Sequence, residues 1–249
     1  MLLAMGSSTI GAASTSVRRL EVPRPHYEAE FRLGAKLGNA LFNQTLNLKG
    51  AATLDAHMHL STFHVEADIP GNQLNLTGLC RGSQLYLKSS RAGKTVLSVV
   101  DMKRQFSFLE AVRPSALNHI EIKPGTVVKL PVVDPMLSMQ QGDVIISIKD
   151  PEEIKVNDKP VWAYRVEMRL NNFVSVSWVD KKGTTLKRQL IGSLVMEKTS
   201  KKLAAAASSV IDTEIKIPEI NVSEFDNIPV KSVDAFAAGN ESPLSLIAK

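Results

Sequence analysis

The 249-residue sequence lacks most of the features that point directly to a function. It contains one cysteine, Cys80, so no disulfide can form within the chain. Aromatic residues make up 5% of the sequence, and no apolar run approaches the roughly 20 residues that a membrane-spanning helix needs. The formal net charge is +5, and Lys and Arg are scattered rather than interleaved with aromatics, which argues against a nucleic-acid-binding protein.

Motifs of the common enzyme classes are also absent. No Gly-x-Ser-x-Gly elbow, phosphate-binding loop or dinucleotide fingerprint occurs. A transglutaminase-like or papain-like reaction would need Cys80 as its nucleophile, with Arg81 beside it lowering the thiol pKa. No helix N-terminus is expected behind Cys80, so a structural cysteine is the simpler interpretation. We therefore predict a protein that is not an enzyme and that uses no cofactor.

The sequence does contain a period of two, which is typical of half-buried β-strands. In 28–38 the apolar residues are all odd-numbered, and a strand over 41–48 follows a Gly-Asn turn. Across 52–69 the apolar residues are even-numbered up to Leu60 and odd-numbered after Ser61. We interpret 52–69 as one long strand with a β-bulge near Ser61, which suits a strongly curved sheet.

The remaining pattern predicts a β-meander with short turns. Further strands are expected over 73–79, 84–89, 95–100, 126–133, 143–148, 153–156, 162–170, 174–178, 184–190, 194–197 and 210–217, and short helices over 107–112 and 199–209. The predicted fold class is mainly β: a curved antiparallel sheet, a half-barrel-like meander, with one or two short helices. We expect an extended lead-in or signal remnant over 1–27, a curved antiparallel β domain over 28–203, and a short helix, extra strand and linker-like tail over 204–249.

The alternating apolar residues are also the candidate binding site. In an ordinary β-sandwich they would simply form the core. In a concave sheet they would line a groove, since Met adapts to varied ligands and Trp and Tyr often mark a mouth where apolar surface meets water. The groove candidates are Leu54, Met58, Leu60, Trp162, Tyr164, Met168, Val176 and Trp178.

Asp55, His57, His59 and His64 form the one group of residues with metal-like spacing. A strand rises about 3.3 Å per residue, so His59 and His64 would lie roughly 16 Å apart on the predicted strand, too far to share one zinc ion. Only His57 and His59, with Asp55, could share an ion. A solvated outer face explains the pattern as well, and we predict no metal site.

Several short runs between about Glu28 and Leu203 follow a particular order. They are Gly71–Gly78, Lys123–Gly125, Val133–Pro135, Lys159–Val166 and the Ser177–Gly183 turn. In this order they resemble the β-rich N-terminal region of bacterial envelope proteins with a transglutaminase-like domain. More loosely, they are similar to lipoprotein carriers of the LolA and LppX kind. The resemblance implies a half-barrel whose concave apolar face shelters a lipid chain, located in the periplasm or cell envelope.

Two functional hypotheses follow, and the sequence leaves both open. The first is a non-enzymatic envelope domain that holds a hydrophobic or lipid-bearing ligand, such as a lipidated protein, in a concave sheet. The second is an accessory or scaffold domain for a transglutaminase-like or peptidase partner, recruited by pairing at an exposed sheet edge. Neither hypothesis involves nucleic acid or a membrane span.

Overall fold

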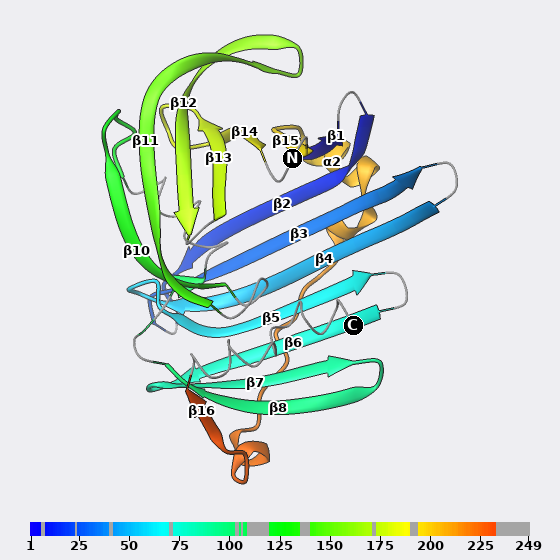
Figure 1. The fold of residues 1–249 in the computed structure, drawn as a ribbon, viewed down its shortest axis with the longest axis vertical. Helices are drawn as coiled ribbons and strands as arrows, with labels where there is room; N and C mark the ends of the chain where they lie inside the picture. The colour runs from blue at the N-terminus through cyan, green and yellow to red at the C-terminus, as the bar shows by residue number, and fades with distance from the viewer. Residues whose placement is uncertain are drawn as a thin grey trace.

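A computed structural model describes residues 1–5, 8–22, 24–39, 42–69, 72–102, 105, 107–108, 120–134, 140–170, 173–189 and 194–232. Most of these residues are in strands (Figure 1). The strands of the first half are β1 Leu2–Met5, β2 Ser8–Leu20, β3 His26–Asn39, β4 Phe42–Asp55, β5 Leu60–Ile69, β6 Asn72–Arg81, β7 Gln84–Arg91 and β8 Lys94–Asp101. Those of the second half are β9 Ser107–Phe108, β10 Val127–Asp134, β11 Gln140–Val156, β12 Lys159–Leu170, β13 Phe173–Val179, β14 Thr185–Gln189, β15 Leu194–Glu197 and β16 Val230–Ser232.

These strands form one sheet in the order β16-β8-β7-β6-β5-β4-β3-β2-β1-β15-β14-β13-β12-β11-β10-β9. Two antiparallel meanders, β1–β8 and β10–β15, are joined through the pairing of β1 with β15. The short end strands pair in parallel, β16 with β8 and β9 with β10. The sheet is curved and not closed, so the predicted fold class is confirmed.

Helical structure in the described residues is limited to the helix α2 (Lys201–Ala207) and two 3-10 turns, η1 (Ser209–Asp212) and η2 (Val222–Phe225). The Ser200 hydroxyl caps α2 by accepting a hydrogen bond from the Leu203 N–H. No helix in this part of the chain combines the length and apolar character needed to cross a bilayer. Of the predicted 107–112 helix, 107–108 form β9 and 109–112 lie outside the described residues.

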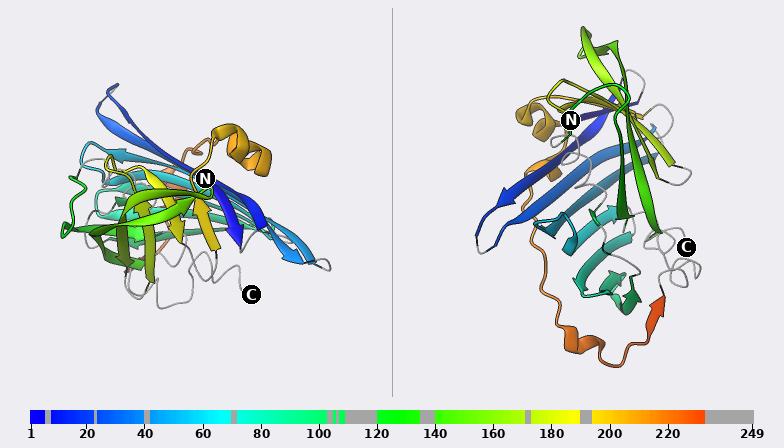
Figure 2. Two further views of the ribbon diagram at one scale, coloured as in Figure 1. Left: turned by 90° about the horizontal axis from the view of Figure 1, so that it is seen from above. Right: turned by 90° about the vertical axis from the view of Figure 1, so that its left-hand side faces the viewer.

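The two faces of the sheet have different neighbours (Figure 2). One side of β2–β8 is crossed by α2 and by the extended segment 213–229, which we call the strap, whereas β10 and β11 lie on the other side. We call the first side the outer face and the second the inner face. The strap is anchored by the Arg32 Nε–H, which donates to the Thr213 carbonyl at 3.0 Å, and by the Lys88–Glu224 ion pair at 2.8 Å. The strand that the sequence predicts over 210–217 is not formed: 210–212 lie in η1, and 213–217, the first part of the strap, have no strand pairing.

Aromatic side chains on the inner face lie over glycines in the neighbouring strand. Phe31 pairs with Gly50 across β3 and β4, and Phe63 pairs with Gly78 across β5 and β6. A Cβ at either glycine would overlap the facing ring. Cross-strand pairs of this kind help to fix strand register and curvature.

Three boundaries differ from those predicted. The single bulged strand expected over 52–69 is a hairpin, because β4 ends at Asp55 and β5 begins at Leu60. The two strands expected over 143–156 are one strand, β11, with an irregular register between Ile148 and Pro151. Residues 1–27, expected to be an extended lead-in, contribute β1 and β2 to the middle of the sheet.

Candidate functional site

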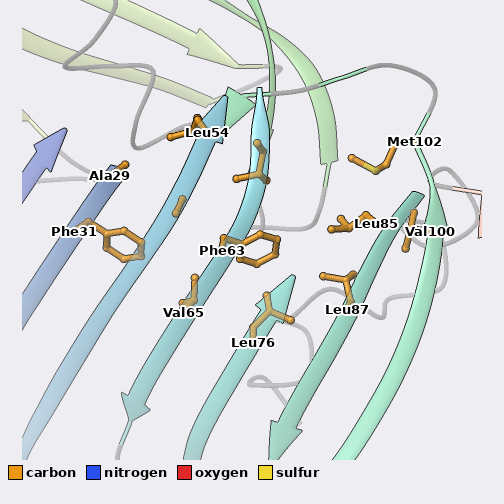
Figure 3. Packing of buried hydrophobic residues seen from close by; sticks show 12 residues of the cluster. Ala29, Phe31, Leu54, Phe63, Val65, Leu76, Leu85, Leu87, Val100 and Met102 are labelled. Atoms are coloured by element: carbon orange, nitrogen blue, oxygen red, sulfur yellow. The ribbon is translucent and has the colours of Figure 1, made fainter. Parts of the chain in front are cut away.

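The inner face of the sheet carries three apolar clusters. The first spans β3–β8 and includes Phe63 and Leu54, both fully buried (Figure 3). The second spans β10–β13 and includes Ile146 and Met168. The third, smaller cluster lies between them and contains Leu3, Ala13, Ala35 and Met196.

Strand register places all three clusters on one surface. Phe31 pairs with Gly50 and Leu33 with Ala13, which continues the face of the first cluster into the third. Leu3 pairs with Gly11 on one side and with Met196 on the other. The inner face is therefore apolar from one meander to the other, apart from a polar interruption on β13 and β14.

That polar interruption consists of Ser175, Ser177 and Arg188. Arg188 pairs with Met196 on one side and with Ser177 on the other, so it lies between the second and third clusters. Both serines are buried, and the Ser175 hydroxyl has no hydrogen-bond partner in the part of the chain that the structure describes. These residues were not predicted as inner-face residues, because the alternation within β13 places its apolar side at Val176 and Trp178.

The eight groove candidates are not brought together in one groove. Leu54 and Leu60 are buried in the first cluster, and Met58 packs against it. Met168 is buried in the second cluster, and Tyr164 packs against that one. The other three candidates, Trp162, Val176 and Trp178, belong to neither cluster.

Trp162 is 67% exposed, contrary to the expected apolar face. It lies in the tip of the β11–β12 hairpin, which bends back over β14 and β15. Asn157 in that tip donates from its N–H to Glu197 Oε2 and from Nδ2 to the Lys198 carbonyl, both at 3.1 Å. The bend buries the opposite side of β12, where Ala163 is 1% exposed, and turns the Trp162 side towards water.

Val176 and Trp178 lie on the outer face, opposite to Met168. Leu170 pairs with Phe173, so even-numbered residues of β12 share a face with odd-numbered residues of β13. Trp178 pairs with Arg165, and its indole N–H donates to Glu152. The prediction that Val176 and Trp178 belong to the same apolar face as Met168 is wrong for this reason.

The His57 and His59 pair belongs to the β4–β5 turn. Asp55 Oδ1 accepts hydrogen bonds from the N–H groups of His57 (2.8 Å) and His59 (2.9 Å), and Oδ2 lies 3.1 Å from His59 Nδ1. Met58 in the same turn has φ +67°. Across the described residues no three His, Cys, Asp or Glu side chains are grouped so as to hold a metal ion. This Asp-capped turn accounts for the metal-like spacing.

His64 is separated from that turn and lies buried on the outer face of β5. Its Nδ1 is 2.9 Å from Thr77 Oγ1, and its Nε2 is 3.1 Å from Glu66 Oε1. Glu66 also pairs with Lys49 at 2.9 Å. Partial burial alone would raise the pKa of Glu66, but the hydrogen bonds and charges of Lys49 and His64 hold it below its ordinary value.

A polar cavity of about 420 Å³ lies between this part of the outer face and the strap. Its sheet side is formed by Glu66, Asn75, Thr77 and other polar residues, and its strap side includes Glu219. It offers few apolar groups and so does not suit an acyl chain.

Cys80 is placed among apolar residues rather than in a catalytic setting. It pairs with Leu85 and packs against the first cluster. Burial raises the pKa of its thiol to about 12, the opposite of the lowering that Arg81 was expected to cause. A thiol with this pKa is almost entirely protonated near neutral pH and is a poor nucleophile.

Comparisons with known proteins identify no family. No family model and no curated protein matches the sequence. A solved β-barrel-like protein of domain of unknown function DUF1849 from Brucella abortus is similar over 79% of this chain and 91% of its own, with 10% identity and a TM-score of 0.48. A DUF1089 family protein from Pseudomonas aeruginosa is similar over 74% of this chain and 92% of its own, with 14% identity and a TM-score of 0.36. Neither likeness says what this chain binds or does.

Proposed function

We propose that this chain is a non-enzymatic binding domain of the bacterial cell envelope, which holds a hydrophobic or lipid-bearing ligand against the inner face of its sheet. The single observation that carries the proposal is the apolar inner face, which runs across both meanders of an unclosed sheet. The outer face, by contrast, carries ion pairs such as Lys49–Glu66 and Arg32–Glu30. An open, curved sheet with one apolar side offers acyl chains a surface away from water.

Small residues on the inner face support this proposal. Ala29, Ala35, Ala52 and Ala67 lie there. Side chains of this size take up less of the concave side of a bent sheet than large side chains would. The first cluster is closely packed, with Leu54, Phe63 and Leu85 fully buried, so the ligand should lie nearer to the third cluster.

Retained ligand is the direct test of this proposal. The protein should carry a reproducible extra mass in native mass spectrometry, which extraction with organic solvent removes, and should then bind the apolar probe N-phenyl-1-naphthylamine. Ala35→Leu, on the inner face, should weaken probe binding several-fold. Ala51→Leu is the matched control, because Ala51 is about as buried but lies on the outer face of β4. No extra mass and no probe binding, or equal losses in both variants, would refute the proposal.

A second candidate function is an accessory domain that pairs with a partner through a sheet edge. β16 pairs only with Val99–Asp101 of β8. The segment 94–98 of β8 is therefore paired with β7 alone and forms a sheet edge in the described residues. Val96 in this segment is 55% exposed. An uncovered strand edge can pair with an added strand. A transglutaminase-like or peptidase protein that co-purifies with the wild type but not with Val96→Pro would favour this function over the first.

A further inference from the structure

The floor of the cavity under the strap consists of two rows of polar side chains that cross three neighbouring strands. The rows run from β5 through β6 to β7, and their members pair in register: His64–Thr77–Lys88 and Glu66–Asn75–Ser90. Residues directly opposite each other have their Cβ atoms about 5 Å apart, and the two rows are about 7 Å apart along the strands. The floor therefore presents polar groups at short intervals in two directions.

A buried histidine holds two of these polar groups in place. His64 is 5% exposed, its Nδ1 lies 2.9 Å from Thr77 Oγ1, and its Nε2 lies 3.1 Å from Glu66 Oε1. The Lys49 ammonium group lies 2.9 Å from Glu66 Oε2. The hydroxyl and the carboxylate are thus oriented before a ligand binds, which reduces the entropy that binding costs.

The roof of the cavity is the middle of the strap, at 218–220. The strap is fixed on both sides of this point. Before it, the Arg32 Nε–H donates to the Thr213 carbonyl, and after it, Phe225 is buried with its ring centroid 5.4 Å from that of Tyr86. The space between floor and roof is about 420 Å³, within the range of roughly 300–1,000 Å³ that ligand sites occupy.

The hydrogen-bonding groups of the lining suit a ligand with many hydroxyl groups. Asn75 and Gln73 each carry an amide that donates and accepts hydrogen bonds, and the Ser90 hydroxyl does both as well. The carboxylates of Glu66 and Glu219 only accept. A sugar hydroxyl donates one hydrogen bond and accepts others, so it can pair with every one of these groups.

The charged groups of the lining favour a neutral ligand. Glu66 and Glu219 would repel a phosphate or a carboxylate, and Lys88 would repel an amine. Glu66 is paired with Lys49 and Lys88 with Glu224, at 2.9 and 2.8 Å. A neutral ligand leaves both of these ion pairs intact.

We propose that the cavity under the strap binds a short neutral saccharide. Its hydroxyl groups bond to Glu66, Asn75 and Ser90 on the floor and to Glu219 on the roof, and the C–H face of one sugar ring lies against Ile220. This site is on the outer face of the sheet. It goes beyond the proposed function and does not depend on it.

Disaccharides of different charge test the class of ligand. Cellobiose, maltose, lactose and N,N′-diacetylchitobiose are neutral, chitobiose is a diamine, and cellobiouronic acid carries a carboxylate. Each would be titrated against the full chain and followed by saturation-transfer difference NMR. At least one neutral disaccharide should bind, and more tightly than either charged one. The proposal is wrong if no neutral disaccharide binds, or if a charged one binds most tightly.

Two variants test the place of binding. Glu219→Ala on the roof and Asn75→Leu on the floor should each weaken binding of the preferred disaccharide about twofold to tenfold, because each removes hydrogen bonds to it. Unchanged affinity in both variants would overturn the proposal. Far-ultraviolet circular dichroism and the urea midpoint check that each variant is folded.

The matched control is Glu214→Ala, which also removes an exposed carboxylate from the strap but lies outside the cavity. It should keep the wild-type affinity, and an equal loss in Glu214→Ala and Glu219→Ala would overturn the site. A failure of this site leaves the proposed function standing, because binding of N-phenyl-1-naphthylamine tests the other face of the sheet.

Discussion

The pairing of Phe63 with Gly78 makes a quantitative prediction about the sheet. Phe63 is fully buried, and a Cβ at Gly78 would overlap its ring. Replacing a strand-interior glycine with alanine should otherwise stabilise by about 0.5–1 kcal/mol, whereas overpacking of a core costs about 1–3 kcal/mol. Gly78→Ala should therefore lower the free energy of unfolding by about 1–2 kcal/mol.

Removing the ring should reverse the sign of that effect. Phe63→Ala alone should cost about 3–5 kcal/mol, and in this background Gly78→Ala should become neutral or stabilise by up to about 1 kcal/mol. The coupling free energy would be about 1–3 kcal/mol, measured from urea unfolding of the four proteins by far-ultraviolet circular dichroism.

Phe31 provides the control for this cycle. It is an inner-face phenylalanine like Phe63, but it lies on β3, three strands away from Gly78 on β6. Phe31→Ala combined with Gly78→Ala should be additive within about 0.5 kcal/mol. If Gly78→Ala has the same cost with and without Phe63, the ring does not occupy the space above the glycine, and the argument for register from these pairs is refuted.

Three further predictions concern single residues. Cys80 should resist iodoacetamide at pH 8 in the folded protein and react after unfolding in urea, because burial raises its pKa to about 12; rapid labelling of the folded protein would contradict this. The pKa of Glu66 is lowered from an ordinary value near 4.5, so the stability that it contributes is present above that value and lost as the pH falls through the folded-state pKa. Glu66→Gln should therefore lower the urea midpoint at pH 7, by less than about 1 kcal/mol in stability, and the difference should shrink towards pH 3; a constant difference would count against the ion pair. Trp162→Ser should change stability by no more than about 0.5 kcal/mol and Met168→Ala should cost about 2–5 kcal/mol, and a reversed order in urea unfolding would contradict the placement of the two faces.

Much of the fold could be predicted from the sequence, because burying one face of a strand requires alternation. The odd-numbered apolar residues of 28–38 predict β3, and Phe31 and Ala35 are buried there. The same alternation, interrupted by short turns, also predicts the hairpin of β6 and β7 and the next strand, β8. Curvature was also expected, and the register does shift at Ser61: Thr53 pairs with Thr62 and Leu54 with Leu60, so Ser61 is the extra residue of β5.

The β4–β5 hairpin could not be predicted because its turn leaves no trace in the alternation. Leu54 before the turn and Leu60 after it are partners and both even-numbered, so the apolar residues change phase only at the irregularity around Ser61. The turn contains no Gly, Pro or Asn; Asp55 forms it with its side chain, and Met58 adopts the left-handed conformation. A non-glycine residue with positive φ is uncommon, so nothing in the residue types indicated that the chain reverses here.

Which residues of two neighbouring strands share a face of the sheet depends on the number of residues between the strands. That number is harder to predict from the sequence than the alternation within each strand. Both strands flanking the 171–172 turn alternate, and their even-numbered residues look equivalent in the sequence. Leu170 and Phe173, which have two residues between them in the sequence, are partners, so an even position pairs with an odd one. Counting across the turn would have placed Ser175 and Ser177, not Val176 and Trp178, beside Met168. The same count leads to Arg188 opposite Ser177, and so to a cation on the inner face that alternation within single strands cannot reveal.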